Sequence, residues 1–198
     1  MAIAPVWFIS HGAPDLVLRD QPATRFLKQL RLEGIRGLVV LSAHWFSRSE
    51  LQLNVEPSPA LMYDFYGFPE PLYRIRWPAK SPQWLQEAVS DQLLLAGLPA
   101  TAVHRELDHG VWSPLSLMDP QSELPLVQIA IPASFTPAQL WQLGEALQGL
   151  REQGIGILAS GAITHNLRAL GPDGSPVPQW ASQFARWLEQ TMAEGDRG

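Results

Sequence analysis

The amino-acid sequence predicts a single α/β domain whose central sheet, mostly parallel or mixed, is covered by helices on both faces. The hydrophobic pattern changes its period repeatedly along the 198 residues, which is typical of alternating strands and helices. The predicted strands are continuously apolar, as expected where both faces of a sheet are buried. A chain of this length is long enough for one well-packed domain and short for two.

Six apolar segments are predicted to be strands: 5–10, 37–43, 51–55, 101–107, 124–131 and 154–163. Five segments are predicted to be helices: 24–32, 82–95, 112–118, 137–152 and 179–192. Ser81 is expected to cap the second of these, with Pro82 as its first residue. Thr136 and Gln139 have the spacing of a capping box for the fourth. The connection 57–82 is unusually long and rich in Pro, Tyr and Phe, which is typical of a functional loop.

Composition restricts the possible functions. With 46% hydrophobic residues and 8 Trp, the chain should be ordered. The absence of cysteine excludes disulfides, thiolate metal ligands and cysteine nucleophiles. A net charge of −5, with 14 scattered Lys and Arg, disfavours nucleic acid or membrane partners. No apolar run reaches the roughly 20 residues of a membrane span, and no secretion signal precedes the first strand, so a cytoplasmic location is expected.

Three of the five histidines follow predicted strands. His11 comes directly after PVWFIS, His44 after VVLSA, and His165 after ILASGAIT. Ligands of open α/β sheets bind at the carboxyl ends of the strands, so these imidazoles are expected to meet at one edge. Imidazole suits Zn, Fe, Cu and Ni. Each histidine alone could be a hydrogen-bonded structural residue, but their shared placement favours a metal site at the C-terminal strand edge.

Two further features could contribute to the same site. His109, beside Asp108, could be a general acid or base on its rim, or Asp-His-Gly could simply begin a helix. The stretch 63–69 (YDFYGFP) contains four aromatic residues, which either stack on a ligand or pack against the domain. His104 has no comparable setting and is expected to be structural or exposed.

Five short motifs occur in a characteristic order: 10–14 (SHGAP), 42–45 (SAHW), 63–69 (YDFYGFP), 108–113 (DHGVWS), and 160–161 (SG) with 165–167 (HNL). In this order they resemble the class III extradiol ring-cleaving dioxygenases, specifically the 4,5-DOPA dioxygenase-like branch. The resemblance implies that residues 1–198 form one catalytic domain. It also implies a non-haem Fe(II), or zinc in some isolated proteins, and cleavage by O2 of a small catechol-type aromatic diol.

Carried over to this chain, the resemblance makes His11, His44 and His165 the metal ligands and His109 the catalytic residue outside the metal shell. Tyr63 and Tyr66 are expected to contact substrate. A carboxylate from Asp15 or Glu106 could join the metal. The protein is expected to be a monomer or a homodimer.

The resemblance has one departure. Relatives are longer and carry a further histidine-bearing C-terminal segment that is missing here, so the expected domain lacks the usual C-terminal portion. One alternative is therefore a catalytically impaired metal-binding or scaffold homologue. A zinc-dependent hydrolase using the same three histidines is a less favoured alternative.

Overall fold

A computed structural model describes residues 3–172 and 174–195 of the chain. These residues cluster into two compact units, Met1–Gly161 and Ala162–Gly198. All six strands belong to the first unit, and the second contains η3 (Leu167–Ala169) and α5 (Gln179–Glu194). Within the described part of the chain, no helix is long and apolar enough to cross a membrane.

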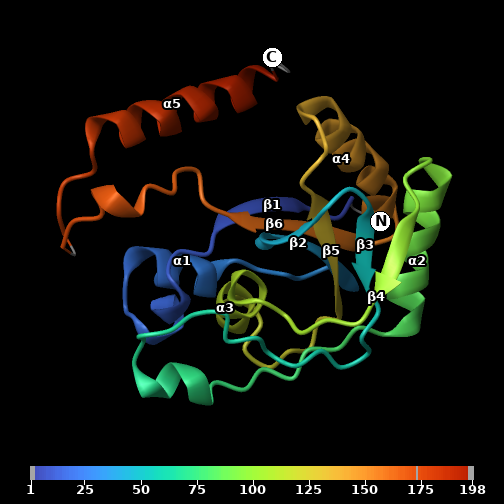
Figure 1. Cartoon of the computed structure of the whole chain (residues 1–198), viewed down its shortest axis with the longest axis horizontal. Coiled ribbons are helices and arrows are strands. Elements are labelled where there is room, and N and C mark those ends of the chain that lie inside the picture. The colour runs from blue at the N-terminus through green and yellow to red at the C-terminus, as the bar shows by residue number, and fades with distance from the viewer. Residues whose placement is uncertain (1–2, 173, 196–198) are drawn as a thin grey trace. The chain divides into compact units, whose positions relative to one another are not determined.

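The first unit is one α/β domain built on a mixed sheet (Figure 1). Its strands are β1 (Val6–Ser10), β2 (Gly37–Ser47), β3 (Leu51–Asn54), β4 (Ala100–Val103), β5 (Leu126–Pro132) and β6 (Ile155–Gly161). They lie in the order β1-β6-β2-β5-β3-β4, with β3 and β5 antiparallel and every other neighbouring pair parallel. The predicted fold class is therefore confirmed.

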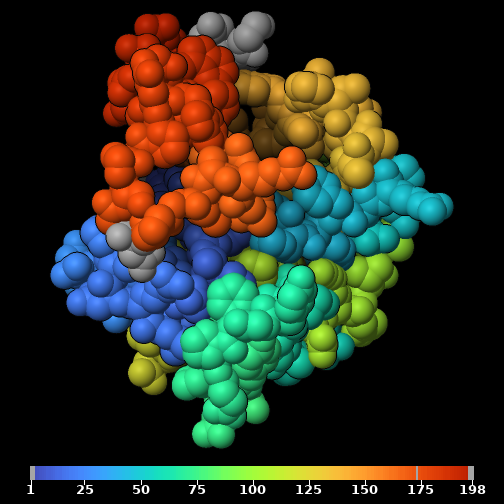
Figure 2. Space-filling view, turned by 60° about the vertical axis from the view of Figure 1, so that its left-hand side comes forward, coloured from blue at the N-terminus to red at the C-terminus, as the bar shows by residue number. Residues whose placement is uncertain are grey.

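Helices cover both faces of the sheet because alternate residues of its strands point to opposite sides. Leu38 and Val40 of β2 pack in one core with α1 (Pro22–Gln29) and α3 (His109–Met118), whereas Val39 packs in the other. That second core contains residues of α2 (Gln83–Leu95) and α4 (Pro137–Glu152). Two short 3-10 helices, η1 (Pro14–Leu18) and η2 (Glu70–Arg74), complete the unit and lie beside each other. Figure 2 shows the blue surface of the N-terminal segment next to the blue-green surface of the 50–75 region.

The boundary of β2 differs from the prediction in a way that matters for the site. The strand does not end at Ala43 but continues to Ser47. Between Leu41 and Phe46 it advances five residues while β5 advances two, from Ile129 to Ile131. Such an irregularity changes the direction in which the side chains of the strand point. His44 therefore lies within a bulged strand rather than after its end.

Three helix boundaries also differ. Helix α1 ends at Gln29, since Leu30 turns to an extended conformation and still packs against the core. Helix α3 begins at His109, earlier than predicted, because Asp108 caps it. The expected Ser81 cap of α2 is wrong: Pro82 holds the cap position, and the Ser81 hydroxyl accepts from the Gln86 side chain. The Thr136 capping box of α4 is confirmed.

The two faces of α4 should differ sharply in their contribution to stability. Leu147 is 2% exposed in the core, whereas Leu140, two turns earlier on the same helix, is 41% exposed. We expect Leu147→Ala to lower the free energy of unfolding by about 2–5 kcal/mol. The control Leu140→Ala should lower it by less than about 1 kcal/mol. Urea unfolding measures both, and equal losses would contradict the assigned packing.

Candidate metal centre

Three histidines of the first unit come together from different elements: His11 directly after β1, His44 within the bulge of β2, and His109 at the start of α3. The ligand atoms offered by His11, His44 and His109 all lie within 4.8 Å of one another. The Nε2 atoms of His11 and His44 are 3.0 Å apart, and the ring centroids of His44 and His109 are 4.1 Å apart. His11 and His109 are buried, and His44 is exposed.

Each histidine is placed by a different local structure. His11 follows β1 and extends its pairing, because its backbone N–H donates to the Gly161 carbonyl at 3.2 Å. The next residue, Gly12, has a φ of +63°, a turn that disfavours any side chain and leads into η1. His44 projects from the bulge of β2. His109 is the first residue of α3, so its motif does begin a helix, and it also lies in the cluster. Its role as a general acid or base stays a prediction.

Asp64, from the long loop, binds His109 at two points. One carboxylate oxygen accepts from the His109 backbone N–H at 3.1 Å and lies 2.8 Å from its Nδ1. An ionised carboxylate can only accept, so Nδ1 carries the proton and Nε2 is left available to the cluster. Burial raises the pKa of Asp64, but its hydrogen bonds and charge interaction with His109 outweigh this, and the net pKa is lowered from 3.8.

The first turn of α3 is tied to the sheet by two buried serines. Ser42 of β2 and Ser160 of β6 are direct neighbours in the parallel register. The Ser42 hydroxyl donates to the Asp108 carboxylate at 2.5 Å and accepts from the His44 backbone N–H at 3.2 Å. The Ser160 hydroxyl donates to the Gly110 carbonyl and lies 2.9 Å from His11 Nδ1. Each serine therefore connects the first turn of α3 to one histidine of the cluster, Ser42 to His44 and Ser160 to His11.

Asp108 is fully buried and held by several donors. Its carboxylate accepts from the Gly110 backbone N–H at 3.1 Å and from the Gln128 amide at 2.7 Å, in addition to Ser42. The Arg105 guanidinium lies 3.9 Å away and stacks over the Trp45 ring. A buried carboxylate is costly unless its oxygens accept hydrogen bonds, and these donors supply them. Asp108 is thus a structural residue that anchors α3.

The donor set fits a divalent transition metal. Two metal–nitrogen bonds of about 2.0–2.1 Å meeting at roughly 90–110° separate their nitrogens by about 2.9–3.4 Å. The 3.0 Å between the Nε2 atoms of His11 and His44 lies within that range. Neutral imidazole is also the nitrogen ligand that zinc and iron commonly take.

Comparison with known proteins agrees with this chemistry. Residues 12–197 match the family described as the catalytic LigB subunit of aromatic ring-opening dioxygenase. The chain belongs to this family. It is 37% identical over 195 residues to a 4,5-DOPA dioxygenase extradiol of Escherichia coli (strain K12), covering 95% of this chain and 70% of that protein. The protein of the same name from Beta vulgaris is 33% identical over 200 residues, covering 98% of this chain and 74% of that protein.

A solved structure supports the fold of this LigB-family chain. The crystal structure of an uncharacterized protein from Escherichia coli K12 has a TM-score of 0.78 and 30% sequence identity. The match covers 95% of this chain and 72% of that chain. The chain is thus an extradiol-type dioxygenase by family, with a three-histidine cluster in its first unit.

His165, the third predicted ligand, lies in the second unit. It precedes η3, which begins after Asn166; the Asn166 side chain accepts from the Arg168 backbone N–H at 3.2 Å. The cluster within the first unit is completed by His109 instead. Because the two units are described separately, coordination by His165 stays a prediction.

In this LigB-family chain, the aromatic loop (residues 63–69) has some side chains packed on the domain and others exposed to solvent. The Tyr63 hydroxyl donates to the Ile75 carbonyl at 2.7 Å and accepts from Arg76, and its ring contacts Trp112. Phe65 lies edge-on to the His109 ring, with centroids 5.7 Å apart. Tyr66, by contrast, is 93% exposed. The loop therefore both packs on the domain and borders the histidines, and substrate contact by Tyr63 and Tyr66 stays a prediction.

Two candidate carboxylates and one histidine lie outside the cluster found among the described residues. Asp15 is buried and pairs with Arg19 at 2.7 Å, and Glu106 is exposed. His104 is exposed and pairs with Glu56 at 3.0 Å, as expected of a residue outside the site. Asp64 and Ser160 were not predicted as site residues, although both lie inside the motifs that carry the family resemblance.

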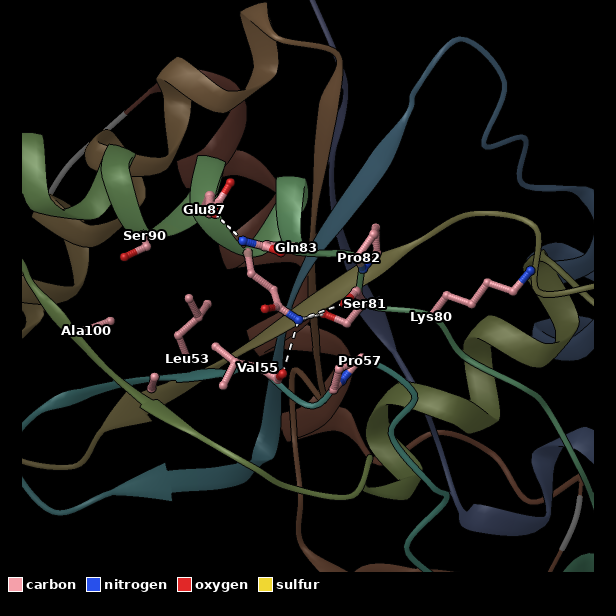
Figure 3. Close-up of a pocket in the computed structure, with 12 residues that line it drawn as sticks. Leu53, Val55, Pro57, Lys80, Ser81, Pro82, Gln83, Glu87, Ser90 and Ala100 are labelled. Carbon is pink, nitrogen blue, oxygen red and sulfur yellow. Dashed lines mark hydrogen bonds between the residues drawn. The ribbon is translucent and has the colours of Figure 1, made fainter.

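A separate groove lies between α2 and the strands β3 and β4 (Figure 3). Its volume is about 680 Å³. None of its lining residues is a histidine, and its amides are used internally: Gln83 donates to Glu87, and Gln86 donates to Val55 and Ser81. The groove is therefore distinct from the histidine cluster.

Gly110 should be intolerant of any side chain. A Cβ at this position would overlap the Ser42 hydroxyl and lie 3.0 Å from both an Asp108 carboxylate oxygen and His44 Cδ2. We expect Gly110→Ala to cost about 1–3 kcal/mol of unfolding free energy and to weaken metal binding. Gly144→Ala in α4 meets nothing within 4 Å and should instead stabilise by up to about 1 kcal/mol. Thermal unfolding and zinc titration test both, and a neutral Gly110→Ala would contradict the close approach.

Asp64 should contribute stability that depends on pH. Its pKa is lowered in the folded protein, so the unfolded chain takes up the proton more readily as the pH falls. We expect the stability advantage of wild type over Asp64→Asn, in metal-free protein, to be complete near pH 6–7. It should shrink as the pH falls below the ordinary pKa of 3.8 and through the lowered value. Urea unfolding across this range measures it, and a constant difference would contradict the pairing.

Proposed function

We propose that this chain opens the ring of a small, DOPA-like catechol with O2 at a non-haem Fe(II) held by His11, His44 and His165. The observation that carries the proposal is the convergence of His11, His44 and His109 at the carboxyl edge of the sheet, in a chain of the LigB family. A bound metal would supply positive charge and open positions for the two catechol oxygens and O2.

His109 is proposed to move the substrate proton. A catechol must lose a hydroxyl proton on binding as a catecholate, and a base within reach accelerates this transfer. Asp64 binds the Nδ1 proton of His109, which leaves the Nε2 lone pair to accept the proton as the catechol O–H bond breaks. The same hydrogen bond from Nδ1 to Asp64 holds the ring in place during the transfer.

The aromatic loop is proposed to form one wall of the substrate pocket. Phe65 contacts the His109 ring, so a catechol presented to His109 lies close to this loop. Tyr66 is exposed and can stack on or hydrogen-bond a substrate, whereas Tyr63 contributes its ring because its hydroxyl is already bonded. An aromatic wall suits a flat aromatic substrate.

Oxygen uptake tests the function directly. Protein loaded anaerobically with Fe(II) and then mixed with aerated L-DOPA or a catechol panel should consume O2 and yield a yellow ring-opened product. We expect His44→Ala to lose tight metal binding and uptake, because it removes a ligand. His104→Ala is the matched control and should retain both, since His104 is exposed outside the cluster. Metal binding without uptake on any catechol would instead indicate a non-catalytic homologue.

The roles of His109 and His165 can be separated by variants. We expect His109→Ala to retain the metal but to lower turnover by about 10²–10⁴-fold, as for loss of a general base. His165→Ala should weaken metal binding itself. Elemental analysis and zinc titration of both variants, alongside the uptake rate, decide the assignment. Loss of metal from His109→Ala with retention in His165→Ala would reverse the two roles.

A further inference from the structure

Ser160 lies where β6 meets the first turn of α3, and its hydroxyl contacts two groups. The residue is 2% exposed. Its Oγ donates to the Gly110 carbonyl and lies 2.9 Å from Nδ1 of His11. These contacts join three segments far apart in sequence: the end of β1, the start of α3 and the end of β6.

The single proton of this hydroxyl determines the direction of both hydrogen bonds. A carbonyl oxygen can only accept, so the serine proton is directed to Gly110. The hydroxyl oxygen then has lone pairs, but no further proton, for the imidazole. Nδ1 of His11 must therefore be the donor, and the neutral ring carries its proton on Nδ1 and a lone pair on Nε2.

We propose that Ser160 is a positioning residue for the metal centre, holding His11 in the Nδ1–H tautomer so that Nε2 faces His44 as a metal ligand. The 3.0 Å between the two Nε2 atoms places that lone pair at the point where the two rings converge. The partner of the second nitrogen of a ligating histidine orients its ring and makes it more basic. Ser160 thus acts on the metal through His11, without contacting it.

Ser42 provides a matched comparison. It is the register neighbour of Ser160 on β2, is equally buried, and also donates to the first turn of α3. Its second contact, however, is the backbone N–H of His44 rather than an imidazole nitrogen. Loss of the Ser42 hydroxyl should therefore leave the tautomer of His11 unchanged, although both variants lose a buried hydrogen bond.

The tautomer can be measured in the metal-free protein. Long-range ¹H–¹⁵N NMR spectra of ¹⁵N-labelled protein distinguish Nδ1–H from Nε2–H histidines, and the His11 signals are assigned by their loss in His11→Gln. We expect His11 of wild type and of Ser42→Ala to be Nδ1–H. In Ser160→Ala the Nε2–H form should become populated. Zinc affinity should fall about 10–100-fold in Ser160→Ala and recover in Ser160→Thr, which restores a hydroxyl.

Two results would overturn the proposal: an Nε2–H tautomer for His11 in the wild type, or unchanged zinc affinity in a folded Ser160→Ala. If Ser160→Thr fails to fold because of its extra methyl group, the wild-type tautomer still decides. The proposal rests on the proposed function only in requiring that His11 and His44 bind a metal, and it does not require that the protein cleave a catechol ring. Zinc binding with no ring opening would refute the dioxygenase activity and leave the role of Ser160 intact.

Discussion

The close approach of the first turn of α3 to strands β2 and β6 is the constraint on which the site depends. Gly110 lies so near Ser42 and Asp108 that a Cβ would not fit. This contact brings a backbone carbonyl to Ser160 and a buried carboxylate to Ser42. Because helix and strands are rigid, one anchored turn places His109 against residues delivered by the sheet.

Hydrogen bonds around the cluster specify which nitrogen of two histidines faces inward. Asp64 accepts from Nδ1 of His109, and Ser160 accepts from Nδ1 of His11. In both rings Nε2 is the atom left for the cluster. Their acceptors differ: Asp64 offers a carboxylate oxygen to His109, and Ser160 offers a hydroxyl oxygen to His11. Both contacts orient the imidazole rings in the cluster.

Much of the fold could be predicted because burial imposes a simple pattern. The apolar runs around Val39 and Ile129 identify strands covered on both faces, and the capping box at Thr136 marks the start of α4. The extension of β2 through His44 could not be predicted, since it depends on pairing with β5 across a bulge. Leu30 likewise packs on the core from outside the helix that its spacing indicated.

The sequence by itself determined the chemistry available: no thiolate, a few imidazoles, and apolar strands that are followed by His11 and His165. It also placed the chain in its family through short motifs in order. Only the tertiary structure brought Asp64 to His109 and Ser160 to His11, 45 and 149 residues apart in the chain. Local patterns report the burial and conformation of neighbouring residues, whereas a hydrogen bond between distant segments depends on how the layers pack.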